Sequence, residues 1–235
     1  MEQERKMPYR LQREIERLKK SILTLGALVE ERVHMAVQAI SDRDDKLARQ
    51  VIDGDIQIDE MEVDLEEECL KLLALHQPVA IDLRFIIAVL KINNDLERIG
   101  DLAVNIGERA MFVSTKERID IPFDFPKMSK IVKTMLKKSL DSLVNMDASL
   151  AKEVCKMDDD VDTINREMYN QVWEGINKHP DRLELLTHLL STSRHLERIG
   201  DLATNISEDV IYMIEGKIVR HKAEDYRSPS EKQKN

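Results

Sequence analysis

The sequence predicts an all-α protein made of two tandem three-helix bundle repeats, which together form an elongated six-helix array. Three observations support this fold class. Turn-forming residues are scarce, because the 235 residues include only seven Gly and six Pro. Aromatic residues make up 4% of the chain and charged residues 34%, which favours long amphipathic helices over a sheet. The third observation is an internal repeat with an offset of 100 residues.

The repeat is clearest in a segment of eleven residues. Residues 96–106 read LERIGDLAVNI, and residues 196–206 read LERIGDLATNI. Ten of the eleven positions are identical, an agreement that chance does not explain. In the first copy, Glu97, Asp101 and Asn105 follow one another every four residues, so they form a polar stripe beside the apolar face of the same helix.

Apolar residues at helical spacing predict three helices in the first repeat, over residues 8–40, 44–76 and 79–112. Residues 1–6 are expected to fray. Asp44 is expected to cap the second helix at its N-terminus. A turn is expected at Gln77, because the residue that precedes a proline is kept out of the helical conformation.

The second repeat is predicted to contain helices over residues 127–146, 148–178 and 180–216. Asp147 matches Asp44 as a cap, and His179 precedes a proline as Gln77 does. Two prolines within residues 121–126 mark a linker between the repeats. We therefore divide the chain into a first three-helix repeat, a linker, a second three-helix repeat and a polar, disordered tail, over residues 1–115, 116–126, 127–217 and 218–235.

Composition and charge exclude several classes of function. The net charge of −9 argues against nonspecific binding to nucleic acid. No apolar run approaches the ~20 residues of a membrane-spanning helix, and the acidic opening segment Met1–Glu4 is unlike a secretory signal. Cys69 and Cys155 are isolated, which is typical of free thiols in a reducing compartment. These features predict a cytoplasmic protein.

Two further acidic pairs have the same four-residue spacing, Asp55 with Asp59 and Asp158 with Asp162. In an antiparallel hairpin, residues equally far from the turn lie at the same level. The midpoints of the matched acidic residues fall at Pro78 in the first repeat and beside Pro180 in the second. The carboxylates are therefore expected to face one another. The candidate metal ligands are Asp55, Asp59, Glu97, Asp101 and Asn105, and in the second repeat Asp158, Asp162, Glu197, Asp201 and Asn205.

Carboxylates brought together in this way repel one another by several kcal/mol at ~4 Å and an effective dielectric near 20. Protonation through raised pKa values would relieve the repulsion, as would pairing with Arg98 and Arg198, or cations bound between the helices. Ligands that are all oxygen suit Mg²⁺, Mn²⁺, Ca²⁺ or iron. Four carboxylates carry more charge than one divalent ion neutralises, which favours a multinuclear site. Glu62 is a further candidate ligand, with Asn165 at the matching position of the second repeat.

Simpler interpretations exist for the same residues. The acidic stripes also fit a solvated surface with arginine–carboxylate pairs. Di-iron bundles use two Glu-x-x-His motifs, whereas this chain offers one, Glu31 with His34, which we interpret as surface or packing residues. His188 lies four residues after Glu184 and predicts a salt bridge on one helix. The glycine within each repeated segment costs ~1 kcal/mol in a helix and predicts the close approach of another group.

The doubled acidic motif, in two three-helix repeats, resembles the PhoU family of phosphate-transport and phosphate-signalling regulators. The resemblance covers about residues 8–216. The E(D)-x-x-x-D motif of that family is matched by Glu97 with Asp101 and by Glu197 with Asp201. Some members of the family bind multinuclear iron clusters, and others bind other ions or none that is evident.

The resemblance implies a regulator rather than an enzyme. Such proteins restrain phosphate uptake and the phosphate-starvation response. They act between the ATPase subunit of a phosphate ABC transporter and a sensor histidine kinase, reach the membrane only peripherally through these partners, and are often homodimers. The alternative function is a metal-dependent enzyme that uses a multinuclear carboxylate site.

Overall fold

The computed structural model of the chain describes residues 2–119 and 123–216. Within these ranges the chain forms seven α-helices and one short 3-10 helix, and no β-strand. These elements are α1 (Glu2–Asp42), α2 (Asp45–Asp53), α3 (Asp55–His76), α4 (Ala80–Ser114), α5 (Phe125–Asn145), α6 (Ala148–Lys178), η1 (Pro180–Arg182) and α7 (Leu183–Glu215). The predicted all-α class is confirmed, with α2 and α3 together in place of one predicted helix.

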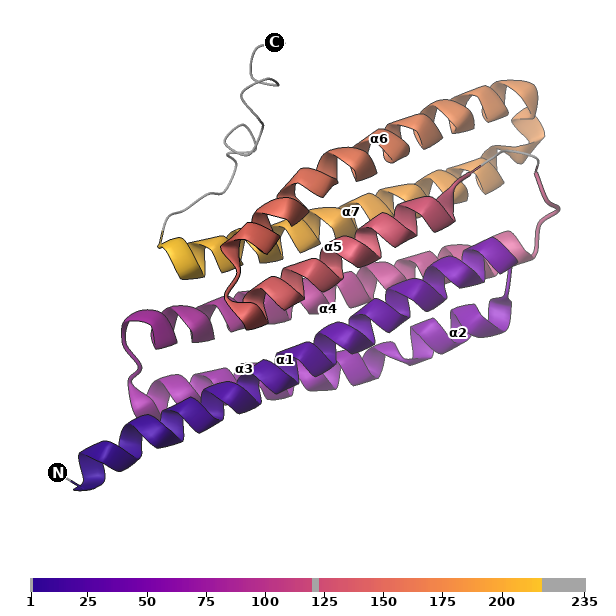
Figure 1. Ribbon diagram of the computed structural model, residues 1–235. Coiled ribbons are helices and arrows are strands. Elements are labelled where there is room, and N and C mark those ends of the chain that lie inside the picture. Colours follow the sequence, from indigo (N-terminus) through magenta and orange to yellow (C-terminus); the bar gives the residue numbers. More distant parts are fainter. Residues whose placement is uncertain (1, 120–122, 217–235) are drawn as a thin grey trace, which may run out of the picture.

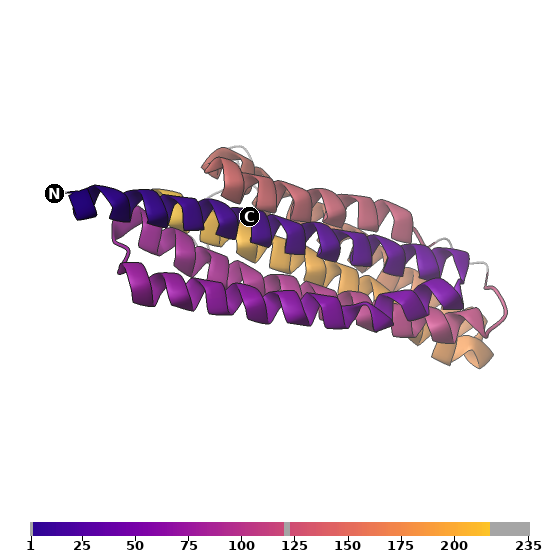
Figure 2. The same cartoon turned by 90° about the horizontal axis from the view of Figure 1, so that it is seen from below.

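The helices lie roughly along one direction and form an elongated bundle (Figure 1). The first repeat consists of α1, α2–α3 and α4, and the second of α5, α6 and α7. At the centre, α4 packs along α7, while α3 packs on the outer side of α4 and α6 on the outer side of α7. The two remaining long helices, α1 and α5, contact each other and lie along one side of the bundle (Figure 2).

The two central helices run antiparallel, with the repeated glycines at the same level. The Lys91 ammonium group pairs with the Asp209 carboxylate at 3.1 Å. Lys91 precedes Gly100 by nine residues, and Asp209 follows Gly200 by nine. The same relation holds for Phe112 with His188 and for Lys116 with Glu184. The two repeats are therefore related by an approximate twofold axis that passes between the glycines.

The second predicted helix is interrupted, which the sequence analysis did not anticipate. Gly54 is both the C-cap of α2 and the N-cap of α3, with φ −82° and ψ −5°. The Arg32 guanidinium group packs directly over this glycine, 2.4 Å from the position that a Cβ atom would take. Glycine has the weakest helix propensity after proline, so the chain breaks where a side chain from α1 occupies the space beside it.

The predicted helix caps are confirmed. Asp44 Oδ1 accepts hydrogen bonds from the backbone N–H groups of Lys46 and Leu47. Asp147 Oδ1 accepts the equivalent bonds from Ser149 and Leu150. Each cap satisfies backbone donors that the first turn leaves unpaired.

The N-terminal end differs from the prediction, and the C-terminal end cannot be compared with it. The first helix begins at Glu2, ahead of the predicted start at Pro8. The predicted disordered tail over 218–235 lies outside the described residues.

Both cysteines are free thiols, as predicted. Cys69 is fully buried between helices and Cys155 is half-buried. Burial raises the pKa of each thiol to about 12, so both side chains are packing groups rather than thiolates. In the described part of the chain, no helix has the length and apolarity that crossing a membrane requires.

Candidate metal centres

In the first repeat, α3 and α4 bring the predicted carboxylates to one level. Gly100 packs against the helix opposite, and a Cβ atom there would stand 3.1 Å from Ile58 and 3.4 Å from Asp55 Oδ1. Burial, followed by the Asp59 and Asp101 carboxylates, raises the pKa of Asp55 to about 6. The hairpin therefore places one half-buried carboxylate among its acidic neighbours, in the register that the turn at Pro78 predicts.

The second repeat reproduces the arrangement with α6 and α7. A Cβ atom at Gly200 would stand 3.5 Å from Val161 and 3.6 Å from Asp158 Oδ1. Burial raises the pKa of Asp158 to about 6, and Asp201 and Asp162 add to the effect. Two copies of the same electrostatic environment thus arise from two different hairpins.

The glutamates that begin each repeated motif belong to the same clusters. Burial raises the pKa of Glu97, with further contributions from acidic residues on both helices of its hairpin. Burial also raises the pKa of Glu197, followed by Asp201 and Asp162, while Arg194 and Arg198 oppose the change. Each cluster is a site where negative charges repel one another in partly desolvated surroundings, which is the condition that a bound cation relieves.

Arginine pairing accounts for only part of this charge. Arg98 pairs with Asp95 at 3.4 Å, on the side of α4 that faces α7, rather than with Asp101. In the second repeat Arg198 lowers the pKa of Asp201, although burial and Asp162 raise it overall. In the first repeat, burial, Asp59 and Asp101 raise the pKa of Asp55, and Arg32 of α1 opposes them. Arginines therefore offset part of the negative charge in both repeats and do not neutralise either cluster by themselves.

The remaining candidate ligands occupy different positions. The Asn105 amide donates to the backbone carbonyl oxygen of Asp101 at 2.7 Å. Asn205 is exposed and lines the groove between α4 and α7, together with Lys91. The Glu62 carboxyl group contributes to the raised pKa of Glu97, so it lies near the first cluster.

Chemically, the clusters offer carboxylate oxygens, the ligand type preferred by hard and borderline cations. Within residues 2–119 and 123–216, no three His, Cys, Asp or Glu side chains are placed so as to hold a metal ion. Asp59, Asp101 and Asp201 are exposed and are free to change rotamer. A cation would fit this donor set only if these side chains turned inward to bind it.

Among the described residues, no histidine is grouped with acidic side chains so as to hold a metal ion. Glu31 and His34 are exposed on α1, consistent with surface residues. The predicted salt bridge of His188 with Glu184 is wrong, because the His188 ring stacks on Phe112 at 3.8 Å and Glu184 pairs with Lys116 at 3.2 Å. The His188 imidazole therefore packs on Phe112 of α4, and burial lowers the pKa of this histidine.

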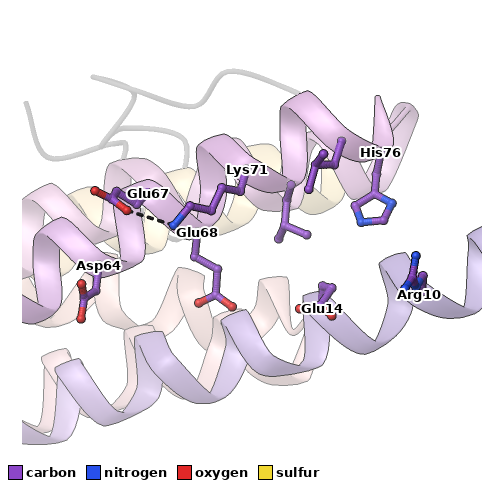
Figure 3. Close-up of a pocket in the computed structure, with 9 residues that line it drawn as sticks. Arg10, Glu14, Asp64, Glu67, Glu68, Lys71 and His76 are labelled. Carbon is purple, nitrogen blue, oxygen red and sulfur yellow. Dashed lines mark hydrogen bonds and ion pairs between the residues drawn. The ribbon is translucent and has the colours of Figure 1, made fainter.

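An open groove between α1 and α3, which sequence reasoning missed, has a volume of about 790 Å³ (Figure 3). Asp64 and Glu68 point from α3 toward α1, and Lys71 pairs with Glu67 at 2.9 Å. Burial and then Glu14 raise the pKa of Glu68. The available signal was the length of α1, 41 residues against 21 in α5, which extends Arg10 and Glu14 alongside α3. The groove supplies no repeated ligand set.

Comparisons with known proteins agree with this architecture. The model of the PhoU domain matches residues 22–110 and again residues 125–210. A phosphate-specific transport system accessory protein PhoU homolog from Clostridium acetobutylicum is 36% identical over 88% of this chain and 94% of its own length. The homolog from Aquifex aeolicus is 38% identical over 90% of this chain and 96% of its own.

Solved structures show the same similarity. The crystal structure of PhoU from Pseudomonas aeruginosa has a TM-score of 0.84 and 36% identity, covering 88% of this chain and 99% of that one. The phosphate transport system regulatory protein PhoU from Streptococcus pneumoniae has a TM-score of 0.81 and 30% identity, covering 89% and 99%. Fold, repeat and sequence together establish that this chain belongs to the PhoU family.

Proposed function

We propose that this chain is a cytoplasmic regulator of phosphate uptake that works as an accessory to a phosphate-specific transport system. The names of its relatives support the association with such a system. By the same family resemblance, its partners are the ATPase subunit of the transporter and a sensor histidine kinase, and its working form is a homodimer. It restrains uptake and starvation signalling rather than catalysing a reaction.

The two carboxylate clusters are the functional centres of this proposal. A single observation carries it: Asp55 and Asp158 occupy equivalent places against glycines, and burial, followed by acidic neighbours on both helices of the hairpin, raises the pKa of each. Metal ions would neutralise these groups and join α3 to α4 and α6 to α7. Iron in a multinuclear site is our first candidate, with manganese, magnesium or calcium as alternatives.

A metal at these centres would also supply a means of sensing phosphate. Cations bound at an exposed carboxylate cluster retain open coordination positions, which phosphate oxygens fill readily. Phosphate would then bind to the metal-loaded protein and not to the metal-free protein. Calorimetric titration at millimolar phosphate tests this step, and an absence of binding to the loaded protein would reject it.

The regulatory role is tested in cells that lack the chain. Under phosphate-replete conditions these cells are expected to take up phosphate and express starvation genes at starvation levels. Wild-type chain should restore repression, and the Glu97→Ala, Glu197→Ala double variant should not. Unchanged uptake in the deletion strain would contradict the proposal. Steady hydrolysis of phosphoesters by the pure protein, lost in Asp101→Ala, would instead favour a metal-dependent enzyme.

A further inference from the structure

The exposed charges of the bundle are divided between its two sides. Among the described residues of α1 and α5, the exposed side chains include eight basic and three acidic groups, a net charge of +5 with His34 neutral. On α3, α4, α6 and α7 the exposed groups are seven basic and fifteen acidic, a net charge of −8. A chain whose total charge is −9 therefore has one strongly positive side. We call the exposed side of α1 and α5 the α1–α5 face.

The lysines of α5 form the core of this face. Lys127, Lys130, Lys133 and Lys137 follow one another at intervals of three, three and four residues, and all four are exposed. This spacing places them on one side of the helix. Lys133 pairs with Glu30 of α1 at 3.3 Å, and within the described chain the other three have no ion-pair partner. The half of α1 nearer its N-terminus adds Arg13 and Lys20, both exposed. Arg10 lines the groove between α1 and α3 instead, and Arg17 pairs with Glu14 at 3.1 Å.

The chemistry of the face distinguishes the kind of partner it fits. Protein interfaces use large apolar or aromatic side chains as anchors at their centre. In the described chain, the large apolar side chains that are exposed lie on α3, α4, α6, α7 and the turns, for example Ile56, Leu75 and Trp173, and none lies on α1 or α5. A face of spread positive charges without an apolar anchor fits a plane of anionic headgroups.

We propose that the α1–α5 face docks onto the surface of an anionic lipid bilayer. The two helices lie along the same side of the bundle (Figure 2), so a flat surface that meets this side contacts both of them. Packed helices lie about 8–10 Å apart, and the Debye length at physiological salt is about 8 Å. The acidic helices are therefore screened from a membrane that touches α1 and α5.

Docking in this orientation has a consequence for the rest of the molecule. The carboxylate clusters lie on α3, α4, α6 and α7, so the helices that bear them are not the ones that the bilayer covers. The exposed apolar side chains of the same four helices remain available to protein partners. The proposal does not depend on metal binding or on the role in phosphate uptake, because it rests on the distribution of charge.

The test is sedimentation of the full chain with vesicles of phosphatidylcholine alone and vesicles with about one third phosphatidylglycerol. The test variant carries Lys127→Gln, Lys130→Gln and Lys137→Gln. The matched control carries Lys71→Gln, Lys156→Gln and Lys178→Gln, which makes the same change in net charge on α3 and α6. Thermal melting of each protein confirms that it is folded.

Wild-type protein is expected to bind the anionic vesicles and not the neutral ones, with binding that falls as salt rises. The α5 variant should bind on the order of a hundredfold more weakly, because three lysines are removed from the face, and the control should bind as wild type does. Equal losses in the two variants would overturn the proposal, as would equal binding to both vesicle types or none to either. Tighter binding to duplex DNA or RNA than to anionic vesicles at the same salt would assign the face to nucleic acid instead.

Discussion

Asp158 Oδ1 lies 3.6 Å from the point at which a Cβ atom would stand on Gly200. The matching distance in the first repeat, from Asp55 Oδ1 to the Cβ position of Gly100, is 3.4 Å. In each hairpin an aspartate on one helix thus lies against a glycine on the helix opposite. The absence of a side chain there lets the half-buried carboxylate lie against the facing helix, beside the acidic residues that flank the glycine.

This packing predicts different outcomes for alanine at the two glycines. At Gly200 the nearest atoms to a new Cβ would be at 3.5 Å, an ordinary contact, whereas at Gly100 the Ile58 side chain would be at 3.1 Å. Gly200→Ala is expected to raise the free energy of unfolding by about 0.5–1 kcal/mol through helix propensity. Gly100→Ala is expected to be less stable than Gly200→Ala by about 1 kcal/mol. Denaturant melts measure both, and the reverse order would contradict the packing.

The raised pKa of Asp158 predicts that metal-free protein loses stability as pH rises. Its pKa is about 6 in the folded chain, against 3.8 for an ordinary aspartate. The stabilisation is therefore complete below pH ~4 and is lost as pH rises through about 6. After discounting for solvent screening, the loss is roughly 1 kcal/mol.

Asp158→Asn is accordingly expected to raise the melting temperature at pH 7.5 in the presence of a chelator, and to reduce the further rise that metal produces. Asp160→Asn, an exposed neighbour, serves as the control and should do neither. Thermal melts with chelator and with added metal separate the two effects. Equal behaviour of the two variants would show that Asp158 has no special environment.

His195 predicts a second pH dependence, of opposite sign. Burial, then Arg109, Arg198 and Arg194, lowers its pKa to about 4, from 6.5. The unfolded chain binds the proton more tightly, so this contribution to stability is present above pH 6.5 and is lost as pH falls toward 4. With half of the side chain open to screening, the expected loss is roughly 1–2 kcal/mol.

The measurement is the free energy of unfolding between pH 7 and pH 5 for His195→Gln and for His34→Gln. The free energy of unfolding of His195→Gln should fall less between pH 7 and pH 5 than that of wild type, because the half-buried imidazole is absent. The second should decline as wild type does, since His34 is exposed on α1. A steeper decline in His195→Gln than in wild type would contradict the assignment.

Much of the fold followed from local patterns. Helix boundaries, the caps at Asp44 and Asp147, and the level of the acidic pairs depend on spacing within a helix or a hairpin, and the repeat supplied each signal twice. The antiparallel packing of α4 on α7 was not predicted. This packing depends on which apolar stripe of one repeat packs against which stripe of the other. Residue spacing within one repeat does not encode that choice.

The same limit explains the individual errors. Spacing along α7 predicted that His188 pairs with Glu184. In the structure His188 stacks on Phe112 and Glu184 pairs with Lys116, and both of these partners come from the other repeat. The break at Gly54 required knowledge that Arg32 of α1 packs there. The α1–α5 face was invisible for a related reason, since the net charge of the whole chain hides a positive side that only the arrangement of helices reveals.

The central claim, that the two carboxylate clusters bind metal, is tested most directly by elemental analysis of protein purified without added metal. Wild type is compared with the Glu97→Ala, Glu197→Ala variant and with a control that carries Glu108→Ala and Glu184→Ala, exposed residues on the same two helices. We predict stoichiometric iron or another di- or trivalent ion in wild type and control, and its loss in the first variant. Wild-type protein without metal, whose melting temperature does not change when divalent ions are added, would contradict the account.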